Sequence, residues 1–281
     1  MHSDLSWLLS QPFAAATPDG AVRMPFATAQ LVAVQAYRLR AVACDTPLLI
    51  ILLEGTKLGR LGEERHEAGV GQFMLVHRAL QFDVENLPAP SGLYRALAVA
   101  FPWRVIALAR SMLAEHAGTE PVQDASVSVG ALAAVQAPLR AYLEADPADA
   151  MMVDHLALGL LLALARAGHH AFRLAQDPSV AARVRQMIAA APAQDWKAAH
   201  VEQALQFSSA TLRRRLQDEG TSFRAVLLEA RLHAGLTLLQ TTGRSVKAVA
   251  GACGYSSVPS FSTAFIERFG VPPSAVGRLS D

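Results

Sequence analysis

The chain has 281 residues, a length that allows two domains of ordinary size. Hydrophobic residues make up 52% of it, charged residues 17%, and the formal net charge is +1, so the chain as a whole lacks the strong positive charge of a typical nucleic-acid binder. Its two cysteines, Cys44 and Cys253, are far apart in sequence, which excludes a disulfide framework and a cysteine-based zinc site.

No targeting or membrane-spanning segment is predicted. Met1–Phe13 lacks a basic segment followed by an apolar run, so it does not resemble a signal peptide. The most apolar stretch, Met151–Leu164, is too short to cross a bilayer. We therefore expect a soluble cytoplasmic protein that does not contact a membrane.

Residues 30–101 predict a series of short strands separated by turn residues such as Gly71 and Pro88. Regular spacing of short strands is typical of an antiparallel sandwich or barrel. The predicted strands are Leu48–Leu53, Lys57–Leu61, Phe73–Val76, Gln81–Val84 and Leu93–Phe101.

After Pro102, alanine and leucine dominate and helices are predicted over Trp103–His116, Val129–Glu144 and Pro147–Leu174. Pro138 should kink the second of these or mark its true start. The third is apolar on most sides, and such a helix is buried in a core or against a second subunit. The sequence leaves both possibilities open.

The segment 175–178 predicts a joint between a domain at 1–174 and a second at 177–281, with Asp177 as the N-cap of the next helix and Pro178 in its first turn. From residue 177 onward there are 12 Lys and Arg against 8 Asp and Glu, compared with 13 against 16 before it. This asymmetry favours a polyanionic partner for the second domain, although random scatter could also produce it.

The second domain contains one pattern twice, over Lys197–Gly220 and Ser245–Gly270. Each copy predicts a short amphipathic helix, an aromatic residue, two serines and a second helix, for which the serines are natural N-caps. In the clearer second copy, one apolar stripe at i, i+3, i+4 and i+7 is formed by Val246, Val249, Ala250 and Cys253. A helix, a tight turn and a capped helix, twice over, predict a pair of helix-turn-helix motifs.

Helix geometry selects the residues that face DNA in the first copy. If Leu212 and Leu216 point inward, Arg214 points outward, because successive residues advance by about 100° around a helix. Arginine can bind guanine through two hydrogen bonds while its neighbours clamp phosphates. A merely solvated basic patch is the alternative, which the repeated pattern disfavours. The predicted contacts of this helix are Ser209, Ala210, Thr211, Arg213, Arg214, Arg215 and Gln217.

The second copy predicts a weaker reading helix. With Phe261 and Phe265 inward, its outer face presents hydroxyl and small apolar groups but no arginine or lysine. Lys247 and the N-terminus of this helix can still hold phosphate. The predicted DNA contacts of this copy are Lys247, Ser257, Val258, Ser260, Ser262 and Thr263.

The segments Ser208–Leu216, Gly254–Ser257 and Phe269–Ser274, with Arg231-Leu232 and Phe261-x3-Phe265, resemble the DNA-binding region of the AraC/XylS family of bacterial regulators. The resemblance spans about residues 178–278 and implies two helix-turn-helix units joined by a long helix at about 223–240. It implies that the two recognition helices enter adjacent major grooves. Family base contacts fall on positions matching Ala210, Arg213, Arg214, Val258, Ser262 and Thr263. This chain departs from the family at Gln206, where a turn glycine is common, at Thr263, where an arginine is common, and at Arg278, a displaced arginine.

The front half is similar to the N-terminal domain of one AraC subgroup, through Pro47–Lys57, Gly62-Glu63 and Gly71–Leu75. This similarity implies a cupin-like β-barrel followed by helices, which in the family binds an effector, mediates dimerisation, or both. An apolar set could line a pocket or form plain core, and we expect core for most of it. The set is Ile50, Leu52, Phe73, Leu75, Leu97 and Val99.

Catalysis is not expected. The usual cupin metal centre contains an H-x-H pair, which is absent, and adjacent His66 and Glu67 would lie on opposite faces of a strand. No glycine-rich phosphate loop and no G-x-S-x-G motif is present. We therefore expect no metal and no cofactor.

The sequence predicts an α+β protein with a cupin-like barrel and helices before an all-α domain with two helix-turn-helix motifs. We expect a sequence-specific transcription regulator, an activator as is commoner in the family, controlled by a small-molecule effector or by dimerisation. Its partners would be promoter DNA, RNA polymerase, an effector and a second copy of itself. The alternatives are a small-molecule-binding cupin sensor and a protein-partner-controlled regulator, each with secondary DNA binding.

Overall fold

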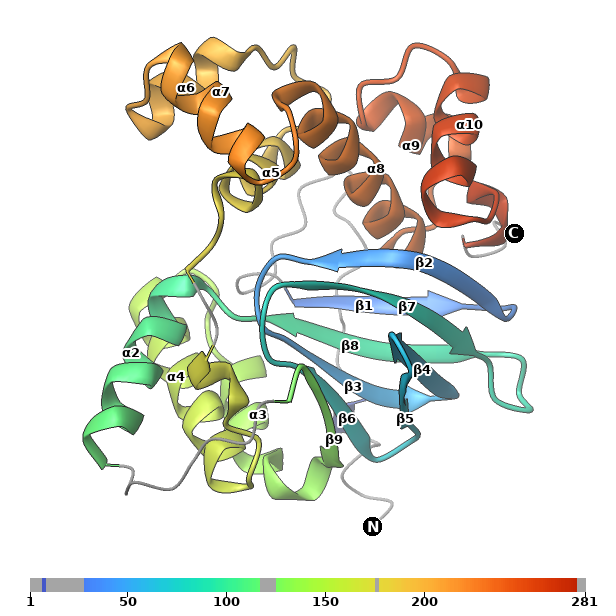
Figure 1. Ribbon diagram of the computed structural model, residues 1–281. Helices are drawn as coiled ribbons and strands as arrows, with labels where there is room; N and C mark the ends of the chain where they lie inside the picture. Colours follow the sequence, from blue (N-terminus) through green and yellow to red (C-terminus); the bar gives the residue numbers. More distant parts are fainter. Residues whose placement is uncertain (1–6, 9–27, 117–124, 175–176, 277–281) are drawn as a thin grey trace. The chain divides into compact units, whose positions relative to one another are not determined.

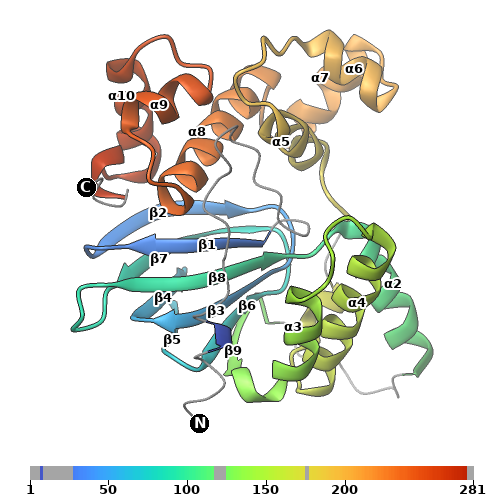
Figure 2. The ribbon, with the colours of Figure 1, turned by 180° about the vertical axis from the view of Figure 1, so that it is seen from behind.

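The computed structural model describes residues 7–8, 28–116, 125–174 and 177–276. The chain forms two compact units, residues 1–176 and 177–281. The first contains two antiparallel sheets and a group of helices, and the second is helical where it is described (Figures 1 and 2). None of the helices in the described ranges combines the length and apolar character that a membrane span requires.

The first unit is built on nine described strands in two sheets. The larger sheet has the order β1-β8-β3-β6-β9 and the smaller has the order β2-β7-β4-β5. The strands are β1 (Thr28–Ala33), β2 (Tyr37–Cys44), β3 (Leu48–Glu54), β4 (Thr56–Leu61), β5 (Glu64–Ala68), β6 (Gln72–Val76), β7 (Leu80–Leu87), β8 (Tyr94–Ala100) and β9 (Val127–Ala131). The α+β prediction is confirmed, and within the described residues the predicted barrel takes the form of two sheets rather than one closed ring.

Strand alternation divides the apolar set that we expected to line a pocket or a core. Phe73, Leu75, Leu97 and Val99 belong to one fully buried cluster with side chains of the helices that follow the strands, so these four are core. Ile50 and Leu52 are out of phase with them and point to the other face of β3. On that face Ile50 lies opposite Met74 of β6. The Met74 side chain lies near Gly59 of β4, in the smaller sheet.

Three helices pack on the larger sheet: α2 (Trp103–His116), α3 (Gln136–Leu143) and α4 (Ala150–Arg166), with short 3-10 turns η1 (Leu132–Ala134) and η2 (Ala171–Leu174). The helix predicted over Val129–Glu144 is wrong in its first part, because residues up to Ala131 form the edge strand β9 beside β6. Pro138 lies in the first turn of α3, near that helix's true start. The third predicted helix ends at Arg166, two residues before Gly168 with φ +92°, and Met151 at its start is 82% exposed, so α4 is not buried on all sides.

The second unit consists of α5 (Val180–Ala190), α6 (Ala198–Leu205), α7 (Ser209–Asp218), α8 (Phe223–Thr241), α9 (Val246–Ala252), α10 (Val258–Phe269) and η3 (Pro273–Ala275). The predicted N-cap of its first helix is wrong. Ser179, not Asp177, accepts the hydrogen bond from Ala182 N at 3.2 Å. A distant group fixes this choice, since the Glu219 carboxylate accepts from Val180 N at 2.7 Å and Ala181 N at 2.8 Å.

Candidate nucleic-acid interface

The first helix-turn-helix is formed by α6 and α7. Val201, Leu212 and Leu216 are buried in one cluster, so the opposite face of α7 is left toward solvent. The Ser208 Oγ accepts from Thr211 N at 3.2 Å, as expected of an N-cap, and lies 2.8 Å from Thr211 Oγ1. Thr211 is therefore partly buried at the start of α7 rather than fully on its outer face.

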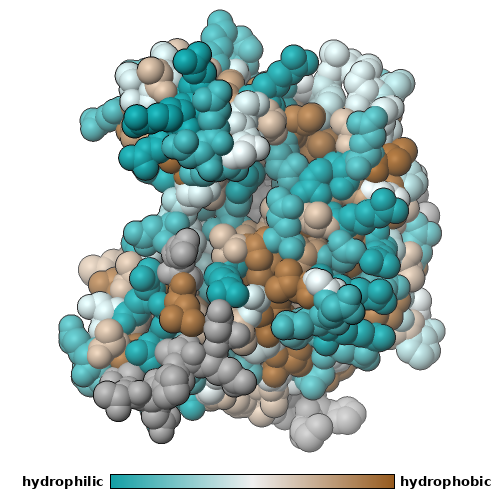
Figure 3. Space-filling model, viewed as in Figure 1, coloured by the Kyte–Doolittle hydropathy of each residue, from teal (hydrophilic) through white to brown (hydrophobic). Residues whose placement is uncertain are grey.

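The outer face of α7 carries the expected positive charge. The side chains of Arg213, Arg214 and Arg215 are exposed, and none of them makes an ion pair or hydrogen bond with a residue of the described ranges. Ala210 and Gln217 are exposed beside them. Figure 3 shows that hydrophilic residues cover most of the visible surface over α6 and α7. These unpaired guanidinium groups can donate to base edges or phosphates.

Ser209 is differently placed. Its hydroxyl donates to Glu202 Oε2 at 2.8 Å, which joins the first turn of α7 to α6. This bond places a carboxylate beside the N-terminus of the recognition helix. Ser209 therefore belongs to the local structure of the turn as much as to the exposed face.

The second helix-turn-helix is formed by α9 and α10. Phe261, Phe265 and Phe269 are fully buried and form a row along α10, with tilted rings whose centroids are 5.5 and 4.7 Å apart. Ser257 caps the helix: its Oγ accepts from Ser260 N at 3.3 Å and donates to Ser260 Oγ at 2.9 Å. The hydroxyl of Ser257 is thus used inside the protein.

The other predicted residues of the second copy divide by exposure. Lys247 on α9 and Ser260 and Thr263 on α10 are exposed, whereas Val258 and Ser262 are partly buried. No arginine or lysine side chain of α10 lies on the Ser260–Thr263 face, because Arg268 points to α8. The two recognition helices therefore differ in charge as the sequence predicts.

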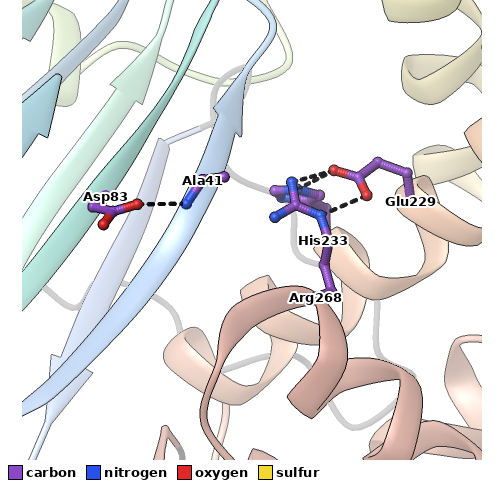
Figure 4. Close-up of polar contacts among 5 residues, drawn as sticks. All are labelled: Ala41, Asp83, Glu229, His233 and Arg268. Atoms are coloured by element: carbon purple, nitrogen blue, oxygen red, sulfur yellow. Dashed lines mark hydrogen bonds and ion pairs between the residues drawn. The ribbon is translucent and has the colours of Figure 1, made fainter. Parts of the chain in front are cut away.

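A charged clamp, Glu229–His233–Arg268, holds α10 on α8 (Figure 4). Arg268 Nε donates to Glu229 Oε2 at 2.7 Å, and His233 Nε2 lies 3.0 Å from Glu229 Oε1. Burial alone would raise the pKa of Glu229, but hydrogen bonds from His233 and Arg268 outweigh it and lower that pKa to about 2. The sequence reasoning missed this clamp. Its only local signal is the i, i+4 spacing of Glu229 and His233.

The turn of the first motif contains a strained residue. Gln206, which stands where a glycine is common, has φ 55° and ψ 40°. This left-handed conformation costs a residue with a Cβ about 1 kcal/mol relative to glycine. We expect Gln206→Gly to raise the free energy of unfolding of the second unit by about 0.5–1 kcal/mol in urea titrations. Gln203→Gly, inside α6, should lower it by about 1 kcal/mol, and a loss of stability in both variants would contradict the strain at Gln206.

The second unit is similar to known DNA-binding domains. A family model described as a helix-turn-helix domain matches residues 201–278. The chain is 35% identical over 100 residues to the HTH-type transcriptional regulator YdeO of Escherichia coli K12, covering 36% of this chain and 39% of that protein. It is 35% identical over 98 residues to the HTH-type transcriptional regulator GadX of Escherichia coli, covering 35% of this chain and 36% of that protein. The matches thus span less than two fifths of these relatives.

Solved structures with a similar fold are also known. An apo form of ToxT from Vibrio cholerae, carrying a single substitution, superposes with a TM-score of 0.59 at 13% identity, over 89% of this chain and 96% of that chain. Unsaturated fatty acid bound wild-type ToxT gives 0.54 at 14% identity, over 88% and 92%. At this identity the likeness establishes the fold alone.

Proposed function

We propose that this chain, whose second unit is a helix-turn-helix domain of the AraC type, is a sequence-specific DNA-binding transcription regulator. The observation that carries the proposal is the pair of serine-capped helices α7 and α10, the first of which presents three exposed arginines that have no partner among the described residues. Helices of this kind fit the major groove, and two on one rigid body reach adjacent turns of the duplex.

In this mechanism α7 supplies most of the attraction. Arg214, at the centre of its outer face, reads a base edge, while Arg213 and Arg215 hold the phosphates on either side. The second helix reads more weakly through Ser260 and Thr263, and Lys247 holds phosphate nearby. Binding should weaken steeply with salt, because each phosphate contact releases counterions.

Sequencing of genomic DNA fragments enriched by the purified full chain tests the proposal. A recurring motif with two contacted segments about one helical turn apart supports it. The absence of any enriched motif, with or without candidate effectors, would sink it, as would an affinity that does not change with salt.

We assign regulation to the first unit, by a small-molecule effector, by dimerisation, or by both. Dimerisation is supported by exposed apolar side chains on its helices, Leu108 and Met112 on α2 and Met151 on α4. Light scattering from the full chain gives the mass, and a monomer at micromolar concentration would contradict the dimer. The same proposal includes three further points. The chain acts in the cytoplasm, it binds promoters, and it activates transcription through contact with RNA polymerase.

A buried charge supports an anionic effector. Lys57 is 3% exposed in the smaller sheet, its Nζ donates to Asn86 Oδ1 at 2.8 Å, and Asn86 Nδ2 donates to the Tyr37 hydroxyl at 2.8 Å. Burial lowers the pKa of Lys57 to about 8. Lys57 makes no ion pair with a carboxylate in the described ranges, and a buried cation without one is unfavourable.

A carboxylate ligand that reached Lys57 would supply the negative charge that this cation lacks. The structurally similar ToxT has been solved with an unsaturated fatty acid. We expect an unsaturated fatty acid to raise the Tm of the full chain by several degrees, as a ligand that binds only the folded state does. Lys57→Met should remove the rise. An equal rise in that variant would exclude Lys57, and no rise with any small molecule would favour a regulator controlled by a protein partner.

A further inference from the structure

One arginine on α8 contacts the segment that leads into the first helix-turn-helix. Arg231 Nε donates to the Pro192 carbonyl at 3.0 Å, and its Nη2 donates to the Gln194 carbonyl at 3.1 Å. This segment connects α5 to α6 and is further fixed by Trp196, whose Nε1 donates to the Ala191 carbonyl at 2.8 Å. Arg231 thus holds the entry to α6 against the middle of α8.

The same guanidinium group packs on the turn of the second helix-turn-helix. Gly254, between α9 and α10, has φ +77°, and a Cβ there would lie 2.9 Å from Arg231 Nη2 and 3.1 Å from the Pro192 carbonyl oxygen. Glycine is needed at this position both for the backbone conformation and for the close approach. One planar group therefore lies between the segment at Pro192 and the turn at Gly254, which are about 60 residues apart in sequence.

We propose that Arg231 is a positioning residue that fixes the distance between the two recognition helices and so selects one spacing of the two half-sites in DNA. Arg231 contacts both sides: its guanidinium donates to the carbonyls of residues 192 and 194 and packs on the turn at Gly254. The clamp of Glu229 and Arg268 holds only α10 to α8. The inference rests on the proposed DNA binding.

The spacing of half-sites responds sharply to the angle between recognition helices. Because B-DNA completes a turn in about 10–10.5 base pairs, adding one base pair rotates one half-site by about 35° around the axis. A rigid pair of helices cannot follow that rotation without losing contacts. A pair joined by a loose connection can follow it, so a loose joint accepts several spacings.

The test uses duplexes that carry the enriched motif with its two half-sites moved apart or together by one base pair. We expect the wild-type full chain to prefer one spacing by about tenfold, comparable to a mismatched base pair. Arg231→Met, which keeps the aliphatic stem and removes the donors, should reduce the preference to about twofold, and Arg231→Lys should fall between. Arg224→Met removes the same charge from an exposed position on α8 and should keep the full preference.

A measurement without DNA distinguishes the loss of the Arg231 contacts from a general loss of stability. With buried Cys44 and Cys253 replaced by alanine, spin labels at Asp218 on α7 and Glu267 on α10 report the distance between the recognition helices. The distance distribution should be narrow in the wild type and broad in Arg231→Met at temperatures where both are folded. Unchanged spacing preference and an unchanged distribution would overturn the role of Arg231. If the wild type enriches no two-part motif, the proposed function itself fails.

Discussion

Arg214→Ala should weaken binding of the full chain to its enriched DNA motif by about 5- to 150-fold, the loss of one two-pronged contact with a base, or about 1–3 kcal/mol. Thr263→Ala, at the corresponding face of α10, should weaken it by less than about threefold, because a single hydroxyl contact contributes about 0.5 kcal/mol. The difference follows from the structure, which leaves Arg214 exposed and unpaired within the described ranges while α10 directs its arginine to Glu229.

The measurement is a titration by fluorescence anisotropy at several salt concentrations. Arg213→Ala and Arg215→Ala should each lower the slope of log affinity against log salt by about one phosphate contact and weaken binding to all sequences alike. Arg183→Ala, an equally exposed arginine on α5 outside both recognition helices, is the matched control and should change little. If Thr263→Ala costs more affinity than Arg214→Ala, the unequal contribution of the two helices is wrong.

The sequence predicts the helices of the second unit well because their signals are local. Apolar spacings of three and four mark α6, α7, α9 and α10. The serine N-caps predicted for α7 and α10 are confirmed at Ser208 and Ser257, each of which accepts a hydrogen bond from a backbone N–H. The failures are positions that a distant group decides. Either Asp177 or Ser179 can cap a helix by its chemistry, and the carboxylate of Glu219, about 40 residues away, selects the start at Val180.

The edge strand β9 was not predicted, because here too a distant group decides the local structure. Val127–Ala131 is short and followed by alanines, so its local preference does not distinguish strand from helix. What selects the strand is the free edge of β6, beside which Gly130 lies against Phe73. A Cβ at position 130 would lie 2.5 Å from His169 Nε2 and closer still to the Phe73 ring. The Glu229–His233–Arg268 clamp and the contacts of Arg231 likewise connect residues that the sequence alone does not bring together.

The second large expected effect is a loss of stability of the first unit at acidic pH. His77 is 1% exposed at the end of β6, and its Nε2 lies 2.8 Å from Ser128 Oγ on β9, which lies 2.8 Å from His169 Nδ1. Its Nδ1 is buried without a hydrogen-bond partner in the described residues, and its ring stacks on Phe172 of η2. The titratable and charged groups that face it are His169, His170 and Arg78, none of which is an acid.

Protonation of His77 is therefore unfavourable in the folded chain. Burial, with smaller contributions from the neighbouring histidines and Arg78, lowers the pKa of His77 from 6.5 to about 3, and burial also lowers the pKa of His169. Between these values the unfolded chain binds a proton that the folded chain does not bind. The free energy of unfolding is thus highest above pH 6.5 and falls as pH decreases toward 3, by about 1.4 kcal/mol for each pH unit.

We expect the first unit to lose about 2 kcal/mol between pH 6.5 and pH 5, as measured by urea titration of the full chain with hydrogen exchange followed in peptides from β6 and β9. His77→Gln should lower stability at pH 7.5, because it disturbs the packing on Phe172, and should flatten most of the pH dependence. His155→Gln, at an exposed histidine of α4, should keep the wild-type slope. Equal slopes in the wild type and His77→Gln would show that His77 is protonated as readily in the folded chain as in the unfolded one.

The location of His77, Ser128 and His169 determines which part of the first unit should open first at acidic pH. Ser128 and His169 join the edge strand β9 to the turn after α4, and Phe172 in η2 rests on the His77 ring a few residues before the second unit begins. Loss of these contacts should therefore raise hydrogen exchange first in β9 and in residues 169–174, before exchange rises in the strands at the other edge of the sheet. Uniform exchange across β1, β3 and β9 at pH 5 would instead mean that the sheet opens as one cooperative unit.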